Sequence, residues 1–115
     1  MKTLKNLLYL VSIRMRPDVE FTLVNSTGDR IRCFQSNYYS TDIVTWYYPQ
    51  NKRPSSSSES FDRFPDNTLS DLGLDATSKD WRFADETFES CNAVIKECSL
   101  IIDEFKPYGV KHEND

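Results

Sequence analysis

The sequence is poor in the residue types on which most enzyme sites depend. It has one histidine, three glycines and three cysteines in 115 residues. His112 lies in a polar tail, where a side chain is poorly held, so we do not expect it to act as a general base. A Ser–His or Cys–His pair would also need this residue, and three scattered glycines exclude a glycine-rich phosphate loop. We therefore expect no enzyme and no catalytic residue.

Metal-binding and disulfide patterns are missing as well. Cys33, Cys91 and Cys98 lack CxxC spacing, and no HxH or HExxH motif occurs. The acidic stretch from Asp66 to Asp75 does not match a calcium loop, because Asp71 stands where that loop requires glycine. We expect neither a metal nor a cofactor, and an odd number of free thiols is typical of a reducing cytoplasm.

Long apolar runs are absent too. The longest falls far short of the roughly 20 residues that cross a bilayer. Leu7–Ile13 slightly resembles the apolar region of a signal peptide, but this run is short, and Arg14 and Arg16 prevent it from continuing. The sequence thus predicts a cytoplasmic protein without membrane contact.

The composition is that of one globular domain with an uneven charge. Hydrophobic residues make up 38% and charged residues 28%, which suits a single domain over 1–115. The net charge of −4 excludes a basic nucleic-acid packager. Residues 1–53 carry eight bases and four acids, whereas residues 54–115 carry fourteen acids and six bases. The two halves therefore have opposite net charges, +4 and −8.

Apolar spacing predicts a helix followed by strands. Leucines and a valine three and four apart favour a helix over about residues 3–12, although the later alternation leaves a strand open as the alternative. Residues 19–23 and 31–33 alternate around a turn at 25–29 and indicate a hairpin. A third strand is expected at Ile43–Tyr48, before Pro49.

The second half is expected to begin with loops. Residues 49–60 contain four consecutive serines with nothing to bury and are predicted to be a flexible loop within the domain. Residues 61–79 contain Pro65, Asn67 and Gly73, which favour short turns over a continuous helix. Residues 109–115 are expected to be a loose tail.

The clearest pattern is a seam of apolar residues near the C-terminus. It predicts a long helix with a break near Ala84–Asp85, and its width favours packing on the chain's own sheet over a coiled coil. The seam residues, three and four apart, are Trp81, Ala84, Phe88, Cys91, Ile95, Cys98, Ile102 and Phe105. The predicted fold is α+β: a small, mainly antiparallel sheet of three or four strands, covered by the long C-terminal helix, with the N-terminal helix or strand alongside.

Two side-chain clusters are candidates for binding. Residues 59–104 hold twelve acids and four bases, and five aromatics fall between Tyr38 and Tyr48 near several arginines and lysines. Acidic surfaces attract basic partners, whereas aromatics interleaved with arginines can stack on nucleic-acid bases. The residues expected to bind a partner are Asp62, Asp66, Asp71, Asp75, Glu86, Glu89, Trp46 and Tyr48.

In size, charge and layout the chain resembles the small cytoplasmic immunity proteins of bacterial contact-dependent growth inhibition systems, and also phage-encoded inhibitors. No shared motif carries this resemblance. It implies a small binding protein that neutralises a cognate toxin, such as a nuclease, by covering its active site or substrate path. The partner would be a protein with a basic surface. The alternatives are a nucleic-acid-binding module that uses an aromatic and arginine sheet face, against which the net negative charge weighs, and a phage-type inhibitor of a host protein.

Overall fold

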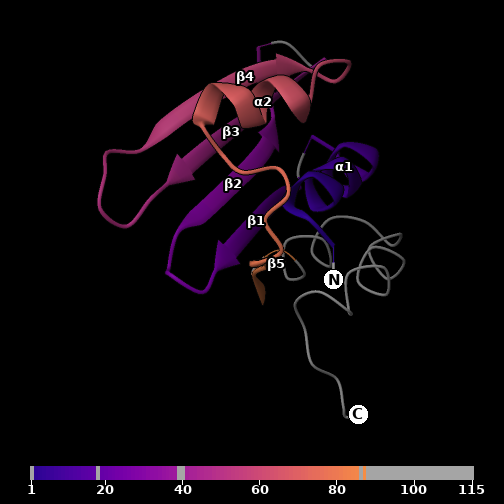
Figure 1. Ribbon diagram of the computed structural model, residues 1–115. Coiled ribbons are helices and arrows are strands. Elements are labelled where there is room, and N and C mark those ends of the chain that lie inside the picture. Colours follow the sequence, from indigo (N-terminus) through magenta and orange to yellow (C-terminus); the bar gives the residue numbers. More distant parts are fainter. Residues whose placement is uncertain (1, 18, 39–40, 86, 88–115) are drawn as a thin grey trace.

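The protein has an α+β fold in a computed structural model that describes residues 2–17, 19–38, 41–85 and 87 (Figure 1). Within these residues, five antiparallel strands form one sheet in the order β4-β3-β2-β1-β5. The α+β prediction is confirmed, but the sheet has five strands instead of three or four. Along the chain the elements are α1 (Leu4–Arg14), β1 (Glu20–Asn25), β2 (Arg30–Gln35), β3 (Asp42–Tyr48), β4 (Ser55–Ser60), α2 (Asp66–Leu72) and β5 (Trp81–Phe83).

The N-terminal segment, for which a helix or a strand was expected, forms the helix α1. Thr3 and Asn6 form a capping box, in which each side chain bonds to the other residue's backbone N–H. The apolar face of the helix is buried, and the chain becomes extended again at Met15. The helix is therefore confirmed. Its buried residues are Leu4, Leu7, Leu8, Leu10 and Val11.

Strands β1 and β2 form the expected hairpin, and β3 pairs with β2. Phe21 pairs with Cys33 and Leu23 with Ile31, so the alternating apolar residues of both arms share one face. Gly28 in the turn has a φ of 89°, a backbone conformation that L-residues rarely adopt. The alternating pattern and the turn residues thus predict this part of the sheet correctly.

Strand β4 occupies most of the segment predicted to be a flexible loop, which is a correction for residues 55–60. The serines pair antiparallel with β3, from Ser55 opposite Tyr47 to Ser60 opposite Asp42. Serine has no strong strand preference, but β3 offers a row of backbone groups that a neighbouring strand satisfies. Backbone pairing therefore outweighs the lack of apolar side chains. Only Ser57 is buried, at 7% exposure.

Helix α2 lies within the segment where only short turns were expected. Asp66 in its first turn interacts favourably with the helix dipole, and Gly73, at a φ of 66°, ends it in the left-handed conformation. Turns flank the helix on both sides. At seven residues it is too short for its sequence to show a helical period.

Strand β5 replaces the start of the predicted C-terminal helix, which is a second correction. Trp81 and Phe83 are buried and Arg82 is exposed, so the side chains alternate as in a strand and pair with β1. A strand of three residues is too short for its sequence to distinguish the strand period of two from the helical period of 3.6. The rest of that helix, at residues 88–105, and the tail at 109–115 lie outside the described residues.

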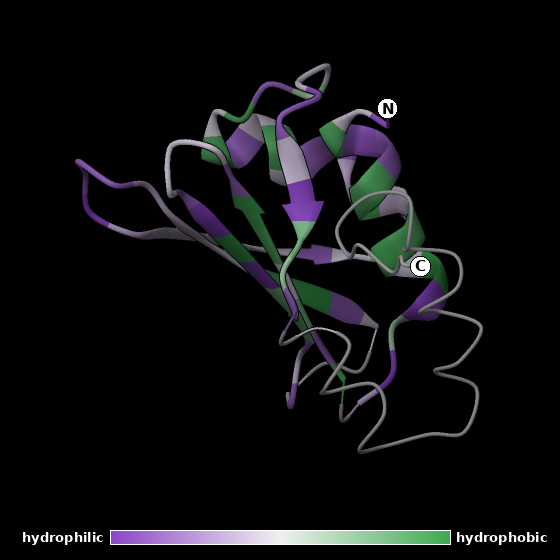
Figure 2. Cartoon of the chain, turned by 90° about the horizontal axis from the view of Figure 1, so that it is seen from below, coloured by the Kyte–Doolittle hydropathy of each residue, from purple (hydrophilic) through white to green (hydrophobic). Residues whose placement is uncertain are grey.

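The sheet has two chemically different faces. Both helices lie on the same side of it (Figures 1 and 2), and the N-termini of α1 and α2 are joined by the Lys5–Asp66 ion pair. Within the described residues, α1 and α2 cover this side of the sheet, which we call the helix face. The sheet residues that the helix face buries are Phe21, Leu23, Ile31, Cys33, Ile43, Thr45, Ser57, Trp81 and Phe83.

Candidate functional site

The structure divides the expected partner-binding residues between two surfaces. Asp66 and Asp71 lie on α2, with Asp62 in the turn before it and Asp75 in the turn after it, and all four are exposed. Trp46 and Tyr48 lie on the opposite face of the sheet, because their positions on β3 alternate with those of the buried residues. Glu86 and Glu89 lie outside the described residues. The described residues of this set therefore lie on opposite faces of the sheet.

Acidic residues are concentrated in the segment that runs from the end of β4 through α2 to the turn after it. Residues 59–75 hold five acids and one base, Arg63, and we call these five acids together the acidic face: Glu59, Asp62, Asp66, Asp71 and Asp75. Lys5 of α1 reaches one edge of it, with its Nζ 3.0 Å from Oδ1 of Asp66. Both members of this ion pair are exposed, so the pair contributes little to stability. The acidic face consequently keeps a net negative charge.

Glu59 and Asp71 form the centre of the acidic face. The Ser57 hydroxyl donates to Oδ2 of Asp71 at 3.0 Å, which holds this carboxylate against β4. A hydrogen bond with Asp71 raises the pKa of Glu59 above its ordinary value, and burial and the negative charge of Asp71 act in the same direction, while a hydrogen bond with Asn67 and the positive charge of Arg63 oppose them more weakly. Two carboxyl groups this close repel each other once both are ionised. A positive charge from a partner would relieve that repulsion.

Asp75 is held by its own turn. Its carboxylate accepts hydrogen bonds from the hydroxyl and the backbone N–H of Thr77, at 2.7 and 2.9 Å. These bonds lower the pKa of Asp75, so it stays ionised across the physiological range. Asp75 therefore supplies a fixed negative charge just after α2.

Glu59 is the member of the acidic face that the sequence did not single out as a binding residue. Its place depends on β4, which has no apolar alternation to reveal it. With residues 55–60 read as a loop, nothing relates Glu59 to Asp71 twelve residues later. The serine strand and the acidic residue within it are recognisable only from the pairing with β3.

The opposite sheet face carries aromatic and basic side chains. Trp46, 37% exposed, stacks on Tyr48 with ring centroids 6.2 Å apart and an interplanar angle of 23°. The register of the strands places three arginines on the same face, two from β2 and one from β5. Tyr47 points to the helix side instead and meets Trp81 edge to face. The arginines and apolar residues of this outer face are Arg30, Arg32, Arg82, Val24, Phe34 and Val44.

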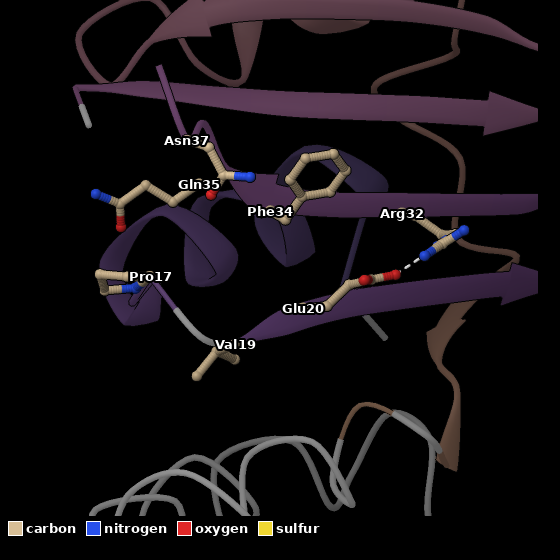
Figure 3. Close-up of a pocket in the computed structure, with 7 residues that line it drawn as sticks. All are labelled: Pro17, Val19, Glu20, Arg32, Phe34, Gln35 and Asn37. Atoms are coloured by element: carbon tan, nitrogen blue, oxygen red, sulfur yellow. Dashed lines mark hydrogen bonds and ion pairs between the residues drawn. The ribbon is translucent and has the colours of Figure 1, made fainter. Parts of the chain in front are cut away.

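An open cavity of about 310 Å³ lies at the end of the outer face, between β1 and β2 (Figure 3). Arg32 forms an ion pair with Glu20 beside the ring of Phe34. The hydrogen bond that Arg32 donates to Glu20 raises the pKa of Arg32 further above its already high value. Both side chains are partly exposed, and their charges largely cancel. The cavity therefore has no excess charge that selects an ionic ligand.

The described residues give little support for chemistry at a reactive side chain. Cys33 is fully buried on β2, and burial raises the pKa of its thiol to about 12. A thiol in that state is a poor nucleophile at neutral pH. Within the described part of the chain, no three histidine, cysteine or acidic side chains gather closely enough to hold a metal ion. His112 lies outside that part, so its predicted lack of function stays a prediction.

Comparisons with known proteins identify no relative. No family model matches the chain, no curated protein matches it, and no solved structure matches it. Among the helices of the described residues, none is long and apolar enough to cross a membrane. What the molecule does must therefore be inferred from its own surfaces.

Proposed function

We propose that the protein is a small cytoplasmic binding protein that neutralises a basic protein partner through the acidic face. The observation that carries the proposal is the pair of carboxyl groups of Glu59 and Asp71, set among three more exposed acids. Like charges held together on a surface are stabilised by a partner that brings opposite charge, and their field accelerates the encounter. This role requires no catalytic residue.

The class of partner follows from the sequence resemblance and from charge. Immunity proteins must capture a toxin quickly, and electrostatic steering raises association rates well above those of neutral surfaces. A nuclease toxin carries a basic cleft for its phosphate substrate, which an acidic surface can cover. We therefore propose an immunity protein for such a toxin. A phage-type inhibitor would use the same acidic face on a basic host protein.

Co-purification of the tagged chain from its own host tests this proposal. We expect native mass spectrometry to find a stoichiometric basic protein bound to the wild-type chain. A variant with Asp62→Asn, Asp66→Asn, Asp71→Asn and Asp75→Asn should lose this partner. The matched control carries Trp46→Ala and Tyr48→Ala on the outer face and should keep it. Retention by the aspartate variant together with loss by the control would place the interface on the outer face and refute the proposal.

The outer face supports a second candidate function, binding of single-stranded nucleic acid. Its specific support is the stacked pair of Trp46 and Tyr48 on the same face as Arg30 and Arg82. Aromatic side chains stack on bases, and arginines contact the backbone phosphates. Filter binding of single-stranded RNA and DNA at low salt tests this alternative, with the Trp46→Ala and Tyr48→Ala variant as the comparison. Absence of retention by the wild-type chain rules it out.

A further inference from the structure

One edge of the sheet is a regular strand whose outer side pairs with no described residue. Strand β4 is last in the sheet order and pairs only with β3. It spans six residues, which at strand spacing is roughly 20 Å of backbone. The other edge strand, β5, has only three residues. Strand β4 is therefore the longer of the two edges available for pairing.

A single hydrogen bond establishes which backbone groups of β4 point outward. The N–H of Phe61 donates to the carbonyl of Thr41 at 3.0 Å, so these two residues face each other across the β3–β4 ladder. Facing and outward residues alternate in an antiparallel pair. Residues 55, 57 and 59 accordingly face β3. Residues Ser56, Ser58 and Ser60 turn their N–H and C=O groups away from the sheet.

Of the outward residues, Ser56 and Ser58 are the two whose backbone groups are best placed to pair with a further strand. The carbonyl of Ser60 already accepts hydrogen bonds from the backbone N–H groups of Arg63 and Phe64, both at 3.0 Å. Ser56 and Ser58 are exposed, and their small side chains leave room for another strand to approach. Natural edges are commonly protected by lysine, proline or a bulge. Pro54 precedes β4, residues 55–60 contain no lysine, proline or bulge, and the one charged side chain of this edge is Glu59.

The charge beside this edge selects the chemistry of the strand that would pair with it. Ser57 and Glu59 point to the helix face, where Asp71 lies against them. Side chains of an added strand would alternate in the same way, so every second one would lie beside this acidic group. Lysine or arginine at those positions would meet Glu59 and Asp71 directly.

A second copy of the chain fits this edge poorly. Two β4 strands paired antiparallel would bring two Glu59–Asp71 groups to the same side of the joined sheet. Like charges close together across a sheet are destabilising. The charge therefore favours a basic segment of a different protein over a homodimer.

We propose that the partner adds an extended segment to β4, pairing with the backbone of Ser56 and Ser58 and directing lysine or arginine side chains toward Glu59 and Asp71. The proposal rests on the proposed function, since it gives the binding mode of that basic partner. Backbone pairing would supply affinity for any extended segment, and the acidic residues would select a basic one. The acidic face and the sheet edge thereby act as one continuous surface.

Amide exchange measured by NMR on the full chain tests this binding mode. The probe is a short capped peptide in which lysine alternates with threonine, and its control has glutamate in place of lysine. We expect the lysine peptide to slow exchange of the Ser56 and Ser58 amides, while the glutamate peptide has no effect. The amides of Ser57 and Glu59 face β3 and should be protected already in the free protein.

Three results of the exchange experiment would reject strand addition, and they differ in what they imply for the proposed function. Binding of the lysine peptide around Asp62 and Asp66, with Ser56 and Ser58 still exchanging freely, leaves the proposed function standing and rejects the binding mode. Failure of the lysine peptide to bind at low salt rejects the binding mode as well. Protection of Ser56 and Ser58 in the free protein that fades on dilution would mean that two copies pair at this edge.

Proline substitution separates the backbone contact from the charge. Ser58→Pro removes an outward N–H without removing a bond to β3, a place where edge strands tolerate proline. We expect about a tenfold loss of affinity for the lysine peptide, the effect of roughly one hydrogen bond. Ser58→Ala keeps the N–H and should bind as the wild type does. Ser56→Pro is the second variant, and protected Ser57 and Glu59 amides show that either variant is folded; unchanged affinity in a folded proline variant would overturn the proposal.

Discussion

Ser57 on β4 donates its hydroxyl to Asp71 on α2, at 3.0 Å. This contact joins the serine strand to the helix that carries the acidic face. It also fixes the Asp71 carboxylate close to Glu59. The stability of the sheet edge and the charge of the acidic face therefore depend on the same small group of side chains.

Removing the Ser57 hydroxyl should destabilise the protein. Ser57→Ala leaves Asp71 without this donor, and a hydrogen bond to a charged group contributes about 1.5–3 kcal/mol, at the low end here because Asp71 is exposed. Urea unfolding followed by circular dichroism measures the change. Ser56→Ala, on the same strand but exposed, is the control and should stay within about 0.5 kcal/mol of the wild type. Equal effects of the two substitutions would contradict the role assigned to Ser57.

Glu59 should make the stability of the protein depend on pH. Its pKa is raised in the folded state above the ordinary value of 4.5, so the folded protein binds more protons than the unfolded chain as pH rises through this range. The free energy of unfolding therefore falls as pH rises from below 4.5 through the folded pKa. Glu59→Gln should be more stable than the wild type at neutral pH, and the gain should shrink in acid. Urea unfolding at several pH values measures this.

The control for this pH prediction is Asp62→Asn, which removes one negative charge from the same acidic face. It should not reproduce the pH-dependent gain of Glu59→Gln. A Glu59→Gln protein that is less stable than the wild type at neutral pH would show that Glu59 and Asp71 do not repel each other.

Cys33 should be unreactive until the protein unfolds. It is fully buried, and its thiol has a pKa of about 12, so almost no thiolate is present at neutral pH. A variant with Cys91→Ser and Cys98→Ser leaves Cys33 as the one thiol. We expect labelling by a disulfide reagent to be negligible in buffer and to rise along the urea unfolding curve. Rapid labelling of the native variant would contradict the burial of Cys33.

Two buried threonines should respond in opposite ways to the same substitution. The Thr87 hydroxyl accepts from the N–H of Thr22 at 2.8 Å and donates to its carbonyl at 2.9 Å. Thr87→Val removes both bonds and should cost about 1–3 kcal/mol. The Thr68 hydroxyl on α2 is buried without a hydrogen-bond partner among the described residues, so Thr68→Val should be neutral or stabilising. Thermal unfolding of the two variants gives the comparison, and similar melting temperatures would contradict it.

The elements that the sequence predicts correctly are those with an apolar period or a defined turn. Helix α1 has leucines on one face and a capping box, and the β1–β2 hairpin has alternation on both sides of Gly28. These are local properties, so they can be recognised without knowing the rest of the fold. The same is true of β3, whose β-branched and aromatic residues favour a strand.

Strands β4 and β5 could not be predicted because tertiary pairing determines them. Four serines become a strand because β3 has an unsatisfied edge, and this cannot be known before β3 is placed. Trp81 and Phe83 became part of a predicted helix because three residues cannot distinguish the two periods. Tertiary context decided both segments.

The candidate site was predicted in composition but not in arrangement. The sequence shows an acidic second half and an aromatic cluster, yet only the sheet register separates Trp46 and Tyr48 from the aspartates of α2. It also brings Glu59 to Asp71. Which side chains share a surface depends on strand alternation and neighbours, and the isolated sequence does not contain that information.

The salt dependence of the association rate, measured with the co-purified partner, tests the central claim most directly. The account predicts that the rate constant falls steeply as salt rises, because screening weakens the field of the acidic face. It also predicts that the variant with asparagine at positions 62, 66, 71 and 75 associates more slowly at low salt and with a flatter salt dependence. A rate that is independent of salt, and equal for the two proteins, would contradict the acidic face as the binding surface.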